Sequence, residues 1–71
     1  MSRYFFHLRR GHLTVLDREG VELASIEEAA KEAGKRAREI ASKDALKGAQ
    51  ANCRVIAIAD DKWLTVMELP F

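Results

Sequence analysis

Hydrophobic side chains mark extended segments at both ends of the chain, with a two-residue period at the first. Residues 3–9 predict a strand, because every second residue is aromatic or aliphatic and these side chains would share one face. Gly11 permits a turn, and residues 13–16 resume the extended pattern, which predicts a β-hairpin. A second hairpin is predicted from strands at 54–59 and 63–69, which are joined by a turn of two aspartates and a lysine.

The period changes to that of a helix between the two hairpins. Ser25 and Glu28 have the spacing of a capping box, in which each side chain bonds the backbone N–H of the other residue. From Ile26 onward, alanine and isoleucine form one apolar stripe, and the opposite face is charged. Gly48 is the expected stop, which gives a helix of about 20 residues.

The predicted element order is therefore ββαββ, and residues 1–71 are expected to form a single small domain. The predicted fold class is α+β: two β-hairpins form an antiparallel sheet, and one long helix packs on one of its faces. Because the helical stripe is mostly alanine, the bulk beneath it must come from the sheet. The expected contributors are Tyr4, Phe6, Leu8, and Trp63 or Met67. The pattern leaves open the strand order and the face that the helix covers.

The second face of the predicted sheet needs a cover of its own. A wet sheet face normally carries polar residues, yet residues 55–59 are all apolar. A chain this short also buries only about 60% of the surface that its unfolded form exposes. We therefore expect a homodimer, formed either by sheet packing or by exchange of strands. The expected interaction face includes Phe5, His7, Ile56 and Ile58.

The charge balance bears on nucleic-acid binding. Twelve basic and eleven acidic residues leave a formal net charge of +1, whereas nucleic-acid-binding domains usually carry a clear basic excess. Nucleic acid is thus a possible partner that the composition does not favour. The expected contacts in that case are the arginines of the first hairpin and the corner that follows it: Arg3, Arg9, Arg10 and Arg18.

Candidate chemistry is sparse. His7, His12 and Cys53 are too few and too scattered for structural zinc, and the acidic pairs lie at turn positions that favour aspartate. We expect no catalytic residues, no metal, no cofactor and no enzymatic activity. The single cysteine excludes a disulfide within the monomer and favours the cytoplasm, and no apolar run approaches the ~20 residues that span a bilayer. No membrane partner is expected.

Three motifs resemble a known family. They are the opening YFFHLR (residues 4–9), the corner D-x-E-G-x-E-L (17–23) and the closing L-P-F (69–71). The family comprises short bacterial proteins, mainly alpha-proteobacterial, that are described only as a domain of unknown function. The resemblance covers almost the whole chain and implies a coherent small domain with no site residues to carry over. At residues 60–62 this chain has two aspartates and a lysine where the family would be expected to have a glycine.

A weaker likeness is to antitoxins of the HicB kind, which have a strand pair, a Gly corner and a helix that begins with an EEA segment. Residues 19–20 and 27–29 are similar in order. This likeness implies an interaction role. Our leading hypothesis is a non-enzymatic interaction or regulatory module that acts as a homodimer and whose protein partner is unknown. The alternative is a nucleic-acid-binding or antitoxin-like regulator that uses the arginine-bearing first hairpin.

Overall fold

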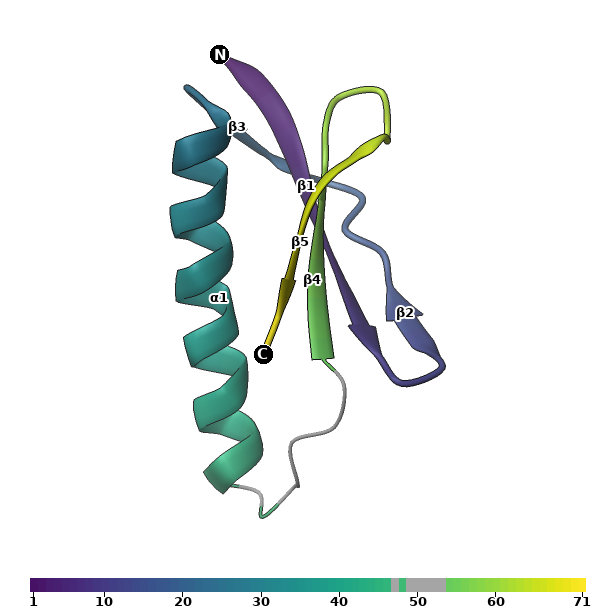
Figure 1. Cartoon of the computed structure of the whole chain (residues 1–71), viewed down its shortest axis with the longest axis vertical. Coiled ribbons are helices and arrows are strands. Elements are labelled where there is room, and N and C mark those ends of the chain that lie inside the picture. The colour runs from purple at the N-terminus through teal and green to yellow at the C-terminus, as the bar shows by residue number, and fades with distance from the viewer. Residues whose placement is uncertain (47, 49–53) are drawn as a thin grey trace.

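A sheet crossed by one long helix makes up the computed structural model, which describes residues 1–46, 48 and 54–71 (Figure 1). The elements in chain order are β1 (Ser2–Arg10), β2 (Leu13–Val15), β3 (Val21–Leu23), α1 (Ile26–Leu46), β4 (Arg54–Ala59) and β5 (Thr65–Pro70). The predicted α+β class is confirmed, and the order differs only by β3, a short strand that the pattern did not predict. The predicted connection at 50–52 and the thiol of residue 53 lie outside the described residues.

β1 is the centre of the antiparallel sheet. The strand order is β2-β1-β4-β5, and β3 also pairs with β1. β2 and β3 lie one after the other along β1, because Arg10 is opposite Leu13 and Ser2 is opposite Leu23. The chain between β2 and β3 therefore passes the middle of β1, at Phe6. This passage positions the corner at residues 17–20.

The helix has one half of the predicted capping box at its start and the predicted glycine after its end, while the Glu28 carboxylate lies 3.7 Å from Lys31. The Ser25 hydroxyl accepts a hydrogen bond from the backbone N–H of Glu28 at 3.3 Å. Just beyond the other end, Gly48 has a φ of +73° and donates its N–H to the carbonyl of Ala45 at 3.1 Å. In the part of the chain that the structure describes, no helix is both long enough and apolar enough to cross a membrane.

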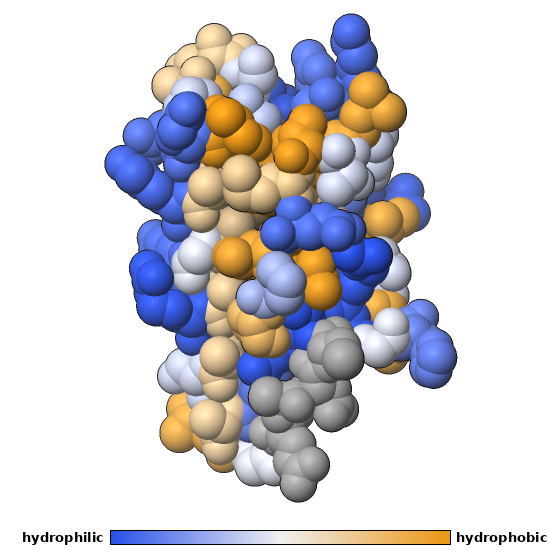
Figure 2. Space-filling model, in the orientation of Figure 1, coloured by the Kyte–Doolittle hydropathy of each residue, from blue (hydrophilic) through white to orange (hydrophobic). Residues whose placement is uncertain are grey.

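The core lies between the alanine stripe of α1 and one face of the sheet. Ala29, Ala33 and Ala37 are buried, and the bulk comes from β1, as expected, and from β4, which was not expected to contribute. The bulkiest sheet residues in this layer are Phe6, Ile56 and Ile58, with Tyr4 and Leu8 packed against them. In Figure 2, hydrophobic surface remains visible between α1 and β5. Trp63 and Met67, the two alternatives expected to add bulk here, both stand outside this cluster, and Met67 of β5 is 38% exposed.

The register corrects the expected interaction face. Ile56 and Ile58 are 2% and 0% exposed and lie under the helix, because they pair with Leu8 and Phe6 of β1. Directly opposed residues in an antiparallel pair point to the same face. Their placement beside Phe5 on an exposed face was therefore wrong. β4 is apolar on both faces, so its own sequence could not show which face the helix covers.

Candidate functional site

Three stacked rings cover the sheet face that lies opposite α1. Trp63, from the turn between β4 and β5, lies over Phe5 and His7 of β1, with ring centroids 4.7 Å and 5.2 Å apart and planes within 20°. Phe5 and His7 are consequently only 7% and 8% exposed. The sequence placed both correctly on the second face, but their expected exposure was wrong because the chain folds its own tryptophan over them.

Small residues of β4 make room for this stack. Ala59 is opposite Phe5 and Ala57 is opposite His7, so the two alanines share the face with the rings. Both alanines are buried, at 1% and 7% exposure. The apolar second face of β4 is thus the floor of an aromatic cluster within the monomer.

The turn that carries Trp63 is organised by Asp60. The Asp60 carboxylate accepts the N–H groups of Lys62 (2.9 Å) and Leu64 (3.0 Å), and its carbonyl accepts the N–H of Trp63 (3.0 Å). Trp63 has a φ of +64°, and it is the only non-glycine residue with a positive φ among those described. This conformation costs an L-residue roughly 1–2 kcal/mol. It also makes β5 begin at Thr65, later than predicted.

Asp17 fills the gap between β2 and β3 at the edge of β1. Its carboxylate accepts three backbone N–H groups at 3.1 Å, from Phe6, Glu19 and Gly20. Partial burial on its own would raise the pKa of Asp17. The hydrogen bonds, led by that from Gly20, together with the charge of Arg36, outweigh this effect and lower the pKa below its usual value. The structural role that the sequence predicted for this turn aspartate is confirmed.

The same corner fixes the imidazole of His7. Its Nδ1 accepts the backbone N–H of Asp17 at 3.0 Å. This contact involves the main chain of Asp17, and it therefore differs from the carboxylate–imidazole pair that orients a general base. Gly20 also packs tightly here: it has a φ of +71°, and a Cβ on it would lie 2.9 Å from the side chains of Arg3 and Phe5. The corner holds β1 and its rings in place.

The four candidate arginines do not form one cluster. Arg3 and Arg9 flank the rings on the stacked face, where they form ion pairs with Glu22 (3.4 Å) and Glu68. Arg10 belongs to the helix-covered face, where it pairs with Asp44. Arg18 lies in the exposed corner, where the described residues offer it no ion pair.

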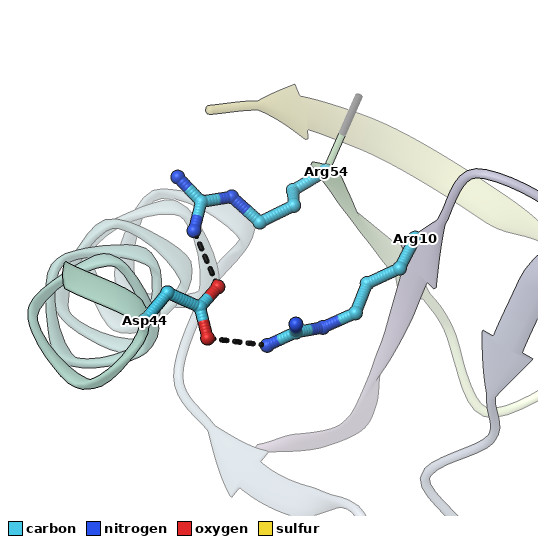
Figure 3. A network of polar contacts seen from close by, with 3 residues as sticks. All are labelled: Arg10, Asp44 and Arg54. Carbon is cyan, nitrogen blue, oxygen red and sulfur yellow. Dashed lines mark hydrogen bonds and ion pairs between the residues drawn. The ribbon is translucent and has the colours of Figure 1, made fainter. Parts of the chain in front are cut away.

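An ion-pair network that the sequence pattern did not predict joins the end of α1 to the sheet (Figure 3); Asp44 and Arg54 are buried in it and Arg10 lies at the surface. Asp44 accepts hydrogen bonds from Arg54 of β4 at 2.5 Å and from Arg10 of β1 at 3.1 Å. The bond from Arg54, supported by Arg10, lowers the pKa of Asp44 against the opposing effect of burial. An aspartate in the last turn of a helix is unfavourable next to the negative end of the helix dipole. Its position in the sequence therefore could have indicated a compensating cation nearby.

Over the described ranges, no three His, Cys, Asp or Glu side chains gather closely enough to hold a metal ion. The protein is thus a small α+β domain with an alanine-faced helix on one face of its sheet and an aromatic stack on the other.

A family model described as "Domain of unknown function (DUF6894)" matches residues 3–71, and the chain belongs to this family. The match spans all elements from β1 to β5 and confirms the resemblance noted from the motifs. Neither the curated proteins nor the solved structures contain a match to the chain. The bacterial origin and the likeness to HicB-type antitoxins stay predictions.

Proposed function

We propose that the protein is a non-enzymatic interaction module that forms a homodimer through the sheet face that carries Trp63. The observation that carries this proposal is the state of Trp63. Its ring is pressed flat against two other rings, its backbone is in a costly conformation, and it still keeps 49% of its surface exposed. Strained residues of this kind cluster at functional sites.

Tryptophan is also the side chain that most often dominates the energy of protein interfaces. Here its plane is already fixed by Phe5 and His7, so little side-chain entropy is left to lose on association. A rigid, flat and apolar surface of this kind is suited to contact with an equivalent surface. The neighbouring Leu64, at 61% exposure, extends the apolar area at the turn.

The charges around the rings support a second copy as the partner. Two ion pairs flank the stack, Arg3 with Glu22 and Arg9 with Glu68, so the surroundings hold equal numbers of positive and negative groups. In a twofold dimer the same patch meets itself, and each arginine can then face a glutamate of the other copy. An apolar centre with a polar rim is the usual anatomy of an interface.

The sheet edges favour packing of faces over exchange or addition of strands. β5 carries an irregularity opposite Ile58 and Ala59, and it also contains Glu68 and Pro70. Bulges, charges and prolines are the devices that keep edge strands from pairing with other chains. β2, on the opposite side of the sheet, has only three residues. Of the two dimer modes that the sequence left open, we therefore propose sheet packing.

The nucleic-acid alternative has less support. Arg3, Arg9 and Arg10 each lie within ion-pair distance of a carboxylate, which reduces the positive potential that phosphate binding requires. The exposed indole offers a face on which a base can stack, and titration with oligonucleotides tests this alternative.

Sedimentation equilibrium from low to high micromolar concentration tests the dimer directly. Because the chain has a single tryptophan, its fluorescence should shift to shorter wavelength as the dimer forms. Glu68→Arg should weaken the dimer by charge repulsion, and Arg9→Glu combined with Glu68→Arg should restore it. Leu13→Ser, on the other face of the sheet, is the matched control and should have no effect.

A wild-type protein that stays monomeric at high micromolar concentration would overturn the proposal. Equal association of the wild type, the Glu68→Arg variant and the double variant would show that this face is not the interface. Quenching of Trp63 fluorescence by single-stranded oligonucleotides at low salt, lost at high salt, would instead support the alternative.

A further inference from the structure

A groove of about 410 Å³ runs between α1 and β1 on the helix-covered face. Its floor is apolar and consists of Phe6 and Leu8 of β1 and Ile56 of β4, and Ile40 of α1 forms its apolar wall. The groove is independent of the Trp63 face, which lies on the other side of the sheet.

The groove exists because one helix is narrower than this sheet. Adjacent strands lie about 4.8 Å apart, so four of them exceed the ~10 Å width of a helix. The register aligns one apolar row across all four strands: Leu69, Ile56, Leu8 and Val15. The helix covers the middle of this row, where Ile56 is 2% exposed, and leaves Val15 60% exposed at the β2 end.

Leu13, two residues earlier on β2, lies on the same face and is 71% exposed. The uncovered area is thus a strip of apolar side chains from Ile40 through Leu8 to Val15 and Leu13, lying alongside α1. In layered α/β architectures, a sheet face that one helix does not cover is normally covered by a second helix.

Ion pairs mark the two ends of the groove. At one end the Arg36 guanidinium lies 4.4 Å above the Phe6 ring, and its Nε is 2.9 Å from the Glu32 carboxylate. Just beyond the other end, the Arg10–Asp44 ion pair connects β1 to the last turn of α1 (Figure 3).

Between these ends, α1 presents a regular row of charges to the groove. Lys35, Glu39 and Lys43 all line it and are spaced four residues apart, so they recur about once per helical turn. Within the described chain none of the three forms an ion pair, whereas Lys31 and Arg36 do. These three side chains, in positive–negative–positive order, are therefore available to form ion pairs with a binding partner.

We infer that the groove binds an amphipathic α-helix of another protein, lying alongside α1. The helix would place an apolar stripe on Leu8, Ile40 and Val15 and carry an acidic, a basic and an acidic residue at four-residue spacing toward α1. This is recognition of a helix in a groove, with flanking charges that select the partner by its charge pattern, as they do in coiled coils.

Two synthetic helical peptides of about 18 residues, or five turns, test the inference. They share a leucine stripe and differ only in the flanking charges, which run Glu–Lys–Glu in one and Lys–Glu–Lys in the other. Titration into the full-length ¹⁵N-labelled protein should shift the amide resonances of Leu8, Val15 and Ile40. The Glu–Lys–Glu peptide should bind at least about tenfold more tightly, because three ion pairs replace three like-charge contacts.

Reversing the row with Lys35→Glu, Glu39→Lys and Lys43→Glu should invert the preference between the two peptides. Val15→Glu should abolish binding, and Leu64→Glu, at a site of similar exposure outside the groove, should not. The Glu68→Arg variant should bind the peptide as the wild type does, which separates this site from the proposed dimer interface.

Three outcomes would overturn the inference: no shifts at the groove with either peptide, equal affinity of the two peptides, or an unchanged preference in the charge-reversed variant. Concentration-dependent shifts of Val15 and Ile40 without any peptide would also overturn it, because they would assign the groove to a second copy of the chain.

Discussion

The carboxylate of Asp17 provides a direct test of how the corner supports the rest of the fold. One of its oxygens accepts the N–H groups of Glu19 and Gly20, and the other accepts the N–H of Phe6, all at 3.1 Å. Asp17→Asn keeps the shape of the side chain but replaces one oxygen by an NH₂ group. That group cannot accept a hydrogen bond, so at least one backbone N–H loses its partner.

The expected cost follows from the number of hydrogen bonds lost. Hydrogen bonds to charged groups contribute about 1.5–3 kcal/mol when they are well shielded. Water reaches part of this carboxylate, so we take about 1 kcal/mol for each bond. Asp17→Asn should then lower the free energy of unfolding by about 1 kcal/mol, and Asp17→Ala, which loses all three bonds, by about 3 kcal/mol. Asp61→Asn, at an exposed turn position, is the control.

Urea denaturation followed by circular dichroism, repeated between pH 7 and pH 3, measures both the size and the origin of this effect. The pKa of Asp17 is lower in the folded protein than its usual value, so its contribution is complete above the unfolded pKa of about 3.9. This contribution is lost as the pH falls through the lower folded pKa. The difference between wild type and Asp17→Asn should therefore stay constant down to about pH 5 and shrink below about pH 4. Equal stabilities at pH 7 would refute this account of the corner.

Three further changes test the packing and the buried charges. Gly20→Ala should lower the free energy of unfolding by about 2–3 kcal/mol, because an alanine is strained in this left-handed conformation and its Cβ would lie 2.9 Å from two β1 side chains. The control Gly11→Ala has the same kind of backbone but open space around it, and it should lower the free energy of unfolding by about 1 kcal/mol. Ala33→Leu should overpack the helix–sheet layer by about 1–3 kcal/mol, while Ala45→Leu on the exposed side should be near neutral; thermal denaturation compares them. Asp44→Asn should lower the melting temperature at pH 7 and remove the part of the acid sensitivity that comes from its lowered pKa, since both guanidinium groups would lose their counter-charge.

The candidate dimer face shows where inference from the pattern stops. The alternation in β1 correctly separated Phe5 and His7 from the helix-facing side chains. It could not show that these two rings would be covered from within the monomer. Their cover, Trp63, lies 56 residues beyond His7 in the chain and reaches them only because Asp60 holds it in a left-handed turn. The need for a cover was predicted, and its source was not.

Features that depend on neighbours in the chain could be predicted from the sequence. The capping box, the alanine stripe, the turn residues and the two-residue alternation each act within a few positions, so the α+β class and most element bounds followed from them. Three features were visible only in the folded chain: which face of β4 meets the helix, how much of the sheet one helix leaves uncovered, and which carboxylate each arginine contacts. These depend on strand register and on contacts between segments far apart in the chain. A strand such as β4, which is apolar on both faces, carries no local signal that shows which face the helix covers.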